Sequence, residues 1–274
     1  MPELPEVETI VRQLRRKIKG KKISRVKVLD VKNINLSGKR FEQLVSRKII
    51  KNIRRRAKVL YWELSGDKYL VFHLKLNGRI LWVKDKEQPH KETRVVFDLP
   101  GSYKIFFDDS RRFAWVRYYD KKELDRFFDK MNFGPEPLER SFTLEVFKER
   151  LARRLNAKIK QLLMEPKFVA GIGNIYAQEA CFYAGIMPTR RVKTLKDQEI
   201  KNLYKSIVFI LKEAVRQKGT SSDVYVDLYG KAGDYVEELK VYGREGEKCT
   251  KCGSVIKFIK QAGRGTRYCP KCQK

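Results

Sequence analysis

Apolar residues recur at helical spacing from the very start of the chain. After the opening "MPELPE", one face carries Val7, Ile10, Val11, Leu14 and Ile18. This spacing of three and four residues predicts an amphipathic helix that begins almost at the N-terminus. Glu6 lies in its first turn, where the positive end of the helix dipole favours a carboxylate. A buried helical face would anchor this terminus, whereas chain ends usually fray.

The pattern changes to that of β-strands between residues 22 and 119. Short runs rich in β-branched and aromatic residues follow one another: "KISRVKVL", "VLYWEL", "YLVFHLKL", "RILWV", "TRVVFDL" and "YKIFFDD". Turn signals such as Asn77-Gly78 and Pro100-Gly101 separate them, which indicates hairpins. The region therefore predicts an antiparallel sandwich or barrel of roughly eight strands.

Helical spacing returns in the second half of the chain. The string "NFGPEPLER" predicts a hinge, because its glycine and prolines cannot continue regular structure. Strings such as "DQEIKNLYKSIVFILKEAVRQ" then predict helices. We expect a multidomain α+β protein with an N-terminal helix and sandwich (1–131), a hinge (132–140), a helical domain (141–223), an irregular connector (224–248) and a cysteine-rich end (249–274).

The charge balance points to a polyanionic partner. The 274 residues include 62 Lys+Arg and 33 Asp+Glu, which gives a net charge of +29. A lysine-rich surface of the kind found in heat-adapted proteins accounts for part of this excess. Nucleic acid is the first candidate for the remainder. No apolar run approaches the ~18 residues of a membrane span, and no signal peptide is evident, so we expect a cytoplasmic protein without membrane contact.

Four of the five cysteines have the spacing of metal ligands. Cys249, Cys252, Cys269 and Cys272 form two C-x2-C pairs separated by sixteen residues. This pattern predicts four thiolates around one tetrahedral Zn²⁺ ion, the alternatives being two disulfides or unliganded thiols. The intervening string "GSVIKFIKQAGRGTRY" fits a β-hairpin that presents Arg264 and Arg267 to an anion. The fifth cysteine, Cys181, falls in a predicted helix and is interpreted as a small apolar residue.

Two other strings carry residue types suited to DNA. "VAGIGNIYAQE" places two glycines and Asn174 directly before a helix, where backbone N–H groups can hold a phosphate. A tight turn between helices explains the same string equally well. "FDDSRRFAW" suggests a wedge in which Arg111 reaches a base edge while Phe113 enters the base stack. A solvated turn is the alternative there.

The first six residues contain a potential nucleophile. Removal of Met1, which a small second residue normally permits, leaves a secondary amine on Pro2. An α-amino group titrates near pH 8, far below a lysine, so an appreciable fraction is unprotonated at neutral pH. The neighbouring carboxylates Glu3 and Glu6 supply acid–base groups beside this amine.

Together these motifs resemble bacterial formamidopyrimidine-DNA glycosylase along the whole chain. The strings that carry the resemblance are "MPELPEVET", "RRFAW", "VAGIGNIYAQE", "VYGREG" and "GRGTRYCPKCQK". It implies a monomeric, nucleoid-associated base-excision repair enzyme acting on damaged double-stranded DNA. Such an enzyme removes 8-oxoguanine and formamidopyrimidines and then cleaves the abasic site by β,δ-elimination. The implied fold adds a helix–two-turn–helix domain and a zinc finger with one structural Zn²⁺.

The resemblance also implies roles for individual residues. Pro2 attacks C1′ of the damaged nucleotide and forms an imine, while Glu3 serves as acid and proton shuttle. Glu6 organises the terminus, Lys58 contacts phosphate and assists strand cleavage, and Arg264 grips phosphates around the flipped nucleotide. The implied DNA-binding positions are His73, Leu76, His90, Arg111, Arg112, Phe113, Arg154, Lys160, Asn174 and Tyr176.

Two positions and one string depart from the family pattern. Leu76 stands where the family commonly has Met, and Ala114 replaces a common Gly after the wedge. The base-capping string "GTSSDVYVDLYGKAGDYV" differs from the usual Thr-Thr-Leu-Arg sequence, which bears on lesion preference. Two alternatives therefore stay open: an endonuclease VIII-type glycosylase for oxidised pyrimidines, and a non-catalytic binder of damaged DNA. The intact set of Pro2, Glu3 and Lys58 argues against loss of catalysis.

Overall fold

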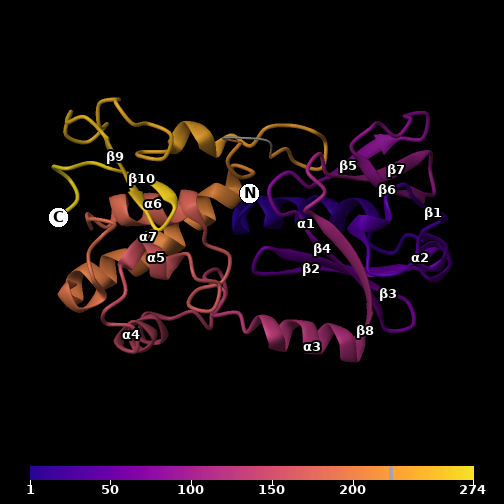
Figure 1. Cartoon of the computed structure of the whole chain (residues 1–274), viewed down its shortest axis with the longest axis horizontal. Coiled ribbons are helices and arrows are strands. Elements are labelled where there is room, and N and C mark those ends of the chain that lie inside the picture. Colours follow the sequence, from indigo (N-terminus) through magenta and orange to yellow (C-terminus); the bar gives the residue numbers. More distant parts are fainter. Residues whose placement is uncertain (222–224) are drawn as a thin grey trace. The chain divides into compact units, whose positions relative to one another are not determined.

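The computed structural model of the chain describes residues 1–221 and 225–274 (Figure 1). These residues form two compact units. The first unit contains Met1–Met131 together with Lys218–Asp234, and the second contains Asn132–Gln217 together with Tyr235–Lys274. Among the described residues, no helix combines the length and apolar character needed to cross a membrane.

Two antiparallel four-stranded sheets form the body of the first unit. One sheet has the strand order β1-β6-β7-β5 and the other has the order β2-β3-β4-β8. The strands are β1 Arg25–Val28, β2 Ile50–Arg56, β3 Val59–Leu64, β4 Lys68–His73, β5 Arg79–Lys84, β6 Thr93–Leu99, β7 Tyr103–Asp108 and β8 Trp115–Asp120. The predicted antiparallel sandwich is confirmed.

Aromatic side chains from both sheets meet in the core of this unit. The ring centroid of Trp62 on β3 lies 4.9 Å from that of Phe72 and 5.2 Å from that of Phe97. Phe107 on β7 meets Phe72 edge-on at 5.8 Å. Tilted and edge-to-face pairs of this kind stabilise a core beyond their buried area alone. Because Phe72 belongs to one sheet and the other two phenylalanines to the second, these contacts hold the sheets together.

Helix α1 (Leu4–Ile18) begins directly after Glu3, as the apolar spacing predicted. Its periodic apolar side chains are at most 1% exposed and share the core of the sheets: Val7, Ile10, Val11, Leu14 and Ile18. Full burial of one such side chain contributes roughly 1.5–3 kcal/mol, so this face anchors the N-terminus firmly. The other helices of the unit are η1 Val31–Asn33, α2 Gly38–Val45 and α3 Lys121–Met131.

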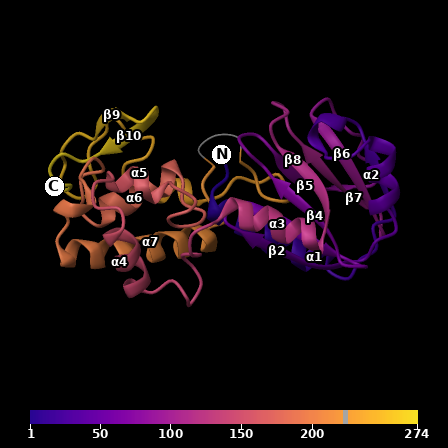
Figure 2. The ribbon, with the colours of Figure 1, turned by 60° about the horizontal axis from the view of Figure 1, so that its bottom comes forward.

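The second unit is helical and ends in a β-hairpin. Its helices are α4 Leu144–Ala152, α5 Ile159–Leu163, α6 Asn174–Tyr183, η2 Val192–Thr194, α7 Asp197–Arg216 and η3 Tyr235–Glu238. Helices α6 and α7 pack side by side around a shared apolar core (Figure 2). Strands β9 (Lys257–Gln261) and β10 (Arg264–Tyr268) pair antiparallel. The predicted helical domain and terminal hairpin are confirmed.

The segment Lys218–Asp234 follows α7 in the chain but belongs to the first unit. Tyr225 and Leu228 are buried in the sandwich core, and the Trp82 N–H donates to the Leu228 carbonyl at 2.8 Å. The sequence predicts a helical domain that ends at residue 223 and a connector that starts at residue 224, which would divide this segment. That boundary lies outside the described residues, whereas the flanking residues belong to the sandwich because their apolar side chains are buried there.

Candidate functional site

The start of α1 is held by one buried carboxylate. Pro2 and Glu3 are both buried, and Glu6 is 1% exposed. The Glu3 N–H donates to Glu6 Oε2 at 2.8 Å, and the Thr220 N–H donates to Glu6 Oε1 at the same distance. Glu6 therefore ties the residue after Pro2 to the segment 218–234. This geometry is what an organising role for Glu6 requires.

Gly219 lies against this carboxylate so closely that no side chain fits. Its φ of +85° is in the left-handed region, and an added Cβ would lie 2.8 Å from Glu6 Oε1. Gly233 is equally confined, because a Cβ there would lie 2.3 Å from the Gly219 carbonyl oxygen. Glycine is therefore needed at 219 for the chain to pass beside Glu6, and at 233 for it to pass beside the Gly219 backbone.

Lys58 lies at the tip of the β2–β3 hairpin, within the same unit as Pro2. The tip is tight, since Ala57 adopts a φ of +54°. Arg55 braces it by donating to the Ala57 carbonyl at 2.9 Å and to Glu8 Oε2 at 3.0 Å. Glu8 belongs to α1, so this contact joins the lysine-bearing hairpin to the helix that carries the terminal proline.

His73, at the end of β4, is a neutral hydrogen-bond donor. Burial, together with the Lys75 and Lys58 cations, lowers the pKa of His73 to about 3. Its Nδ1 accepts a hydrogen bond from the Lys75 N–H at 3.0 Å, which assigns the ring proton to Nε2. A neutral imidazole with a proton on Nε2 can donate to a phosphate oxygen, and the DNA contact of His73 stays a prediction.

Two braced loops carry the residues predicted to enter the base stack. Leu76 lies in the turn between Leu74 and Gly78, and Phe113 in the loop between β7 and β8. Asp109 closes the second loop, because its carboxylate accepts the Arg111 N–H at 3.1 Å and the Ala114 N–H at 2.6 Å. An added Cβ at Gly78 would lie 2.6 Å from the Ala114 Cβ, so the loops pack tightly.

Phe113 is exposed on this rigid support. Its side chain is 54% exposed, and the Arg111 guanidinium lies over its ring at 5.2 Å. An exposed phenylalanine on a rigid polar loop is the arrangement that a base-stack wedge needs. Arg112 instead pairs with Asp30, its Nε lying 3.0 Å from Asp30 Oδ2.

His90 already has partners for both ring nitrogens. Nε2 lies 3.0 Å from the carboxylate of Asp108, and Nδ1 accepts the Glu92 N–H at 3.3 Å. Burial raises the pKa of Asp108, and the electrostatic interaction with His90 partly offsets this rise. DNA contact through a ring nitrogen of His90 requires one of these bonds to open, and the role stays a prediction.

In the second unit, Lys160 is buried and supports other polar groups. It is 1% exposed, and its Nζ donates to Asn174 Oδ1 at 2.6 Å and to Thr266 Oγ1 at 2.9 Å. A buried ammonium is stable only with such partners. Asn174 also donates to the Gly265 carbonyl at 3.2 Å, and Gln178 accepts the Arg267 N–H at 2.6 Å. The network joins the start of α6 to strand β10, and in it Lys160 supports the Asn174 side chain. The DNA-binding roles of both residues stay predictions.

Two other predicted DNA contacts differ in exposure. Tyr176 is 1% exposed, with its ring 6.0 Å from that of Tyr235. Arg154 is at the surface and pairs with Glu165 at 2.7 Å. The surface position suits a phosphate contact for Arg154, whereas the ring of Tyr176 is part of the helical core.

The two arginines of the terminal hairpin have different surroundings. Arg264 is exposed at the start of β10, directly after the turn formed by Ala262 and Gly263. Arg267 is paired at 2.8 and 2.9 Å with Glu245. Its guanidinium also lies between the rings of Tyr242 and Phe258. Arg264 is therefore exposed and can meet an anion, as expected. Arg267 differs from the expectation, because its guanidinium is already paired with Glu245.

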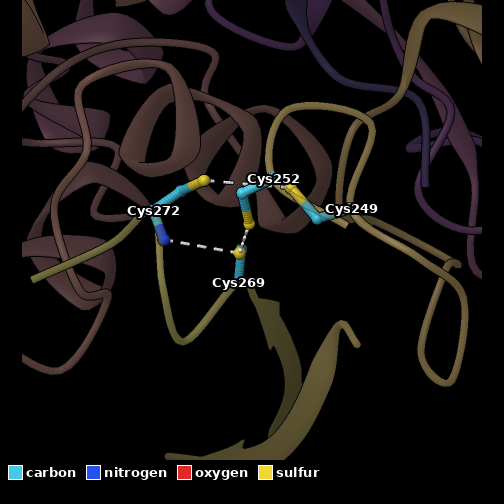
Figure 3. A group of neighbouring side chains, drawn as sticks. All are labelled: Cys249, Cys252, Cys269 and Cys272. Atoms are coloured by element: carbon cyan, nitrogen blue, oxygen red, sulfur yellow. Dashed lines mark hydrogen bonds between the residues drawn. The ribbon is translucent and has the colours of Figure 1, made fainter. Parts of the chain in front are cut away.

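The four paired cysteines form a metal site (Figure 3). Their sulfur atoms all lie within 4.8 Å of one another. Cys252 Sγ is 3.4 Å from Cys269 Sγ, and Cys249 Sγ is 3.9 Å from Cys272 Sγ. Four thiolates bound tetrahedrally to Zn²⁺, each about 2.3 Å from the ion, have sulfur–sulfur distances close to these. The residues fit one structural zinc ion, as the spacing predicted.

Loss of one ligand should release this zinc and weaken DNA binding. Cys269→Ser is expected to lower zinc content from about one ion per chain to near zero and DNA affinity by about tenfold or more. The sandwich should remain folded, because it has a core of its own. Metal analysis and a DNA titration of the full chain measure both effects. The matched control is Cys181→Ala, a cysteine outside the site. Full DNA affinity in zinc-free protein would contradict the prediction.

The structure adds residues that support the candidate site and that the sequence did not single out. Asp109 closes the wedge loop, Gly219 makes room for Glu6, and Thr266 and Gln178 connect the hairpin to the helical core. Asp109 stands inside the string "FDDSRRFAW", where a carboxylate before two exposed arginines was an available signal. The other three act through contacts with residues far away in the chain.

Comparison with known proteins agrees with this geometry. Residues 1–116 match the model of the formamidopyrimidine-DNA glycosylase N-terminal domain, residues 133–226 its H2TH domain, and residues 246–274 a zinc finger found in FPG and IleRS. The formamidopyrimidine-DNA glycosylase of Pelotomaculum thermopropionicum is 41% identical, with 100% of this chain and 99% of that protein covered. That of Carboxydothermus hydrogenoformans is 40% identical, with both chains fully covered.

Solved structures extend the similarity to the fold. A Lactococcus lactis FPG variant in complex with Fapy-dG-containing DNA has a TM-score of 0.93 and 34% identity, with both chains fully covered. The Lactococcus lactis Fpg in complex with abasic-site DNA has a TM-score of 0.92 and 34% identity, with 99% of each chain covered. The family, fold and zinc site predicted from the sequence are therefore confirmed: the chain belongs to the formamidopyrimidine-DNA glycosylase family.

Proposed function

We propose that this chain is a base-excision repair enzyme that acts on damaged double-stranded DNA as a monomer. It is a bifunctional DNA glycosylase, which removes an oxidised purine and then cleaves the strand at the resulting abasic site. The observation that carries this proposal is the fixed N-terminus: Pro2 and Glu3 are buried at the start of α1, and Glu6 holds the Glu3 backbone at 2.8 Å. A terminus fixed in this way suits a nucleophile.

The chemistry begins once Met1 has been removed. The lone pair of the Pro2 nitrogen attacks C1′ of the damaged nucleotide, the N–C1′ bond forms, and the bond from C1′ to the base breaks. The nitrogen then loses its proton, Glu3 protonates the ring oxygen O4′, and the C1′–O4′ bond breaks. Because the amine is secondary, the ring-opened product is an iminium ion, which acidifies the adjacent sugar carbon. Loss of that proton permits β- and then δ-elimination of the two phosphates. Glu3 is the acid and proton shuttle for the sugar.

Residues in each unit hold the DNA backbone. In the first unit, Lys58 and the neutral His73 bind phosphates. In the second unit, the exposed Arg264 and Asn174 do so. The Lys160 contact at 2.6 Å supports the Asn174 assignment, because it fixes the amide at the first turn of α6. Phosphate binding at such a helix start gains from the positive end of the helix dipole. Phe113, supported by Leu76 and Arg111, fills the gap left by the flipped base.

Oxidised purines are the proposed substrate class, and a comparison of lesions tests it. Duplexes with 8-oxoguanine opposite cytosine, a formamidopyrimidine, or thymine glycol are compared at equal enzyme concentration under single turnover. We expect both oxidised purines to be excised faster than thymine glycol. A clear preference for thymine glycol would favour an endonuclease VIII-type specificity. Binding without excision of any lesion would favour a non-catalytic role.

The proposed location is the cytoplasm, on the nucleoid. The net charge of +29 supports attraction to DNA phosphates. The four thiolates of the zinc site support a reducing compartment, because oxidation to disulfides would destroy the site.

A further inference from the structure

The described residues of the segment 218–234, which are 218–221 and 225–234, are joined to one another by hydrogen bonds near Glu6. Thr220 and Asp234 form an isolated β-bridge, and the Gly233 N–H donates to Ser221 Oγ at 2.7 Å. The Ser221 hydroxyl in turn donates to the Tyr225 carbonyl at 2.8 Å. Burial raises the pKa of Tyr225 well above its usual range, so its hydroxyl stays protonated and donates to the Lys218 carbonyl at 3.1 Å. These contacts fix the residues near Glu6 relative to those further along the segment.

One side chain of α1 holds the middle of this segment. Gln13 donates from Nε2 to Asp227 Oδ2 at 2.8 Å and accepts the Leu228 N–H at Oε1 at 2.9 Å. Asp227 is 2% exposed, and its other oxygen accepts the N–H groups of Tyr229 and Lys231. A single amide thus satisfies a buried carboxylate and a backbone donor, and it places both against α1.

Thr220, in the same segment, lies close to the residue that is proposed to bind the nucleotide. The two oxygens of Glu6 bind the N–H groups of Glu3 and Thr220, so Thr220 reaches the carboxylate that orders the residue after Pro2. A nucleotide attached to Pro2 therefore has residues 219–221 as neighbours. During base excision a damaged base accompanies that nucleotide, whereas at an abasic site there is no base. Misplacement of the segment should lower base excision much more than abasic-site cleavage, because the Glu3 N–H still has its own bond to Glu6 Oε2 within α1 and its N-cap.

We infer that Gln13 is a positioning residue for base excision: by fixing Asp227 and Leu228 against α1, it sets where Thr220 and Ser221 lie beside a nucleotide bound at Pro2. This inference rests on the proposed glycosylase and lyase function. Gln13 acts through the segment and does not itself touch the substrate. Misplacement of a binding element by about 1 Å can lower a rate by about 100-fold.

An exchange of amide and carboxylate tests this inference. Gln13→Glu keeps an acceptor for the Leu228 N–H but places a second carboxylate against Asp227 Oδ2. Adding Asp227→Asn restores a donor toward the introduced carboxylate, while the amide oxygen still accepts from Tyr229 and Lys231. The matched control is Asn35→Asp, since Asn35 also bridges two backbone groups in the same unit, the N–H and carbonyl of Tyr118 at 2.9 Å.

Single-turnover rates are measured for 8-oxoguanine excision and for abasic-site cleavage with each full-length variant. For Gln13→Glu we expect excision to fall about 10- to 100-fold while abasic cleavage changes less than about twofold. The double variant should recover excision to within about threefold of wild type, and Asn35→Asp should not separate the two activities. Equal loss of both activities, unchanged excision, or a double variant without recovery would overturn the inference. A wild-type chain that processes neither substrate would refute the proposed function instead.

Discussion

A chain with a blocked N-terminus is expected to lose both base excision and abasic-site cleavage. An additional residue that processing cannot remove converts the Pro2 nitrogen to an amide, whose lone pair is delocalised and no longer nucleophilic. We expect both single-turnover rates to fall by about 10³-fold or more, because the other groups assist a reaction that no longer starts. DNA affinity should fall much less, since the phosphate contacts remain.

Glu3→Gln provides the control for this result. It keeps the free amine of Pro2 but removes the acid, so excision should fall while the amine still forms an imine with an abasic site. Blocked and Glu3→Gln chains should therefore differ in imine formation although both excise poorly. A blocked chain that still cleaves abasic DNA at the normal rate would contradict the role of Pro2.

Replacement of Gly219 by alanine is expected to have the second largest effect. The added methyl group would lie 2.8 Å from Glu6 Oε1, so either the carboxylate or residues 219–220 must move. Displacement of Glu6 disturbs the Glu3 backbone at the start of α1. We expect kcat/KM for excision to fall about 10- to 100-fold.

Gly230→Ala separates this crowding from backbone strain. Gly230 has a φ of +75°, comparable with +85° at Gly219, but nothing lies within 4 Å of an added Cβ. Both variants should lose about 1 kcal/mol or more of unfolding free energy in urea, because alanine is strained in this conformation. Only Gly219→Ala should lose activity. If the two variants had the same kcat/KM for excision, the close approach of Gly219 to Glu6 would be unimportant for activity.

Much of the fold was predictable because its signals are local. The five apolar positions of α1, the strands and the Pro100-Gly101 hairpin turn act through neighbours in the chain, and the structure confirms them. The hairpin predicted at Asn77-Gly78 is wrong, because this turn joins β4 to β5 and the two strands lie in different sheets. The zinc site was predictable for the same reason, since two C-x2-C pairs bring four sulfur atoms together once a hairpin forms. In each case residue type and spacing determine the local geometry.

The parts that sequence did not predict depend on distant contacts. The segment 218–234 follows a helix of the second unit, yet Tyr225 and Leu228 are buried in the sandwich core. The bond from Thr220 to Glu6 spans 214 positions in the chain. Nothing in the local sequence distinguishes the buried Lys160 from the many surface lysines. Its place is set by Asn174 and Thr266, which meet only in the folded unit.

Borohydride trapping on abasic DNA, followed by peptide mass mapping, tests the central claim most directly. Borohydride reduces the imine to a stable amine and leaves a covalent protein–DNA adduct. The predicted adduct lies on the N-terminal peptide, with the added mass on Pro2, and it disappears when the N-terminus is blocked. An adduct that survives blocking and maps to Lys58 would contradict the account and make a lysine side chain the nucleophile.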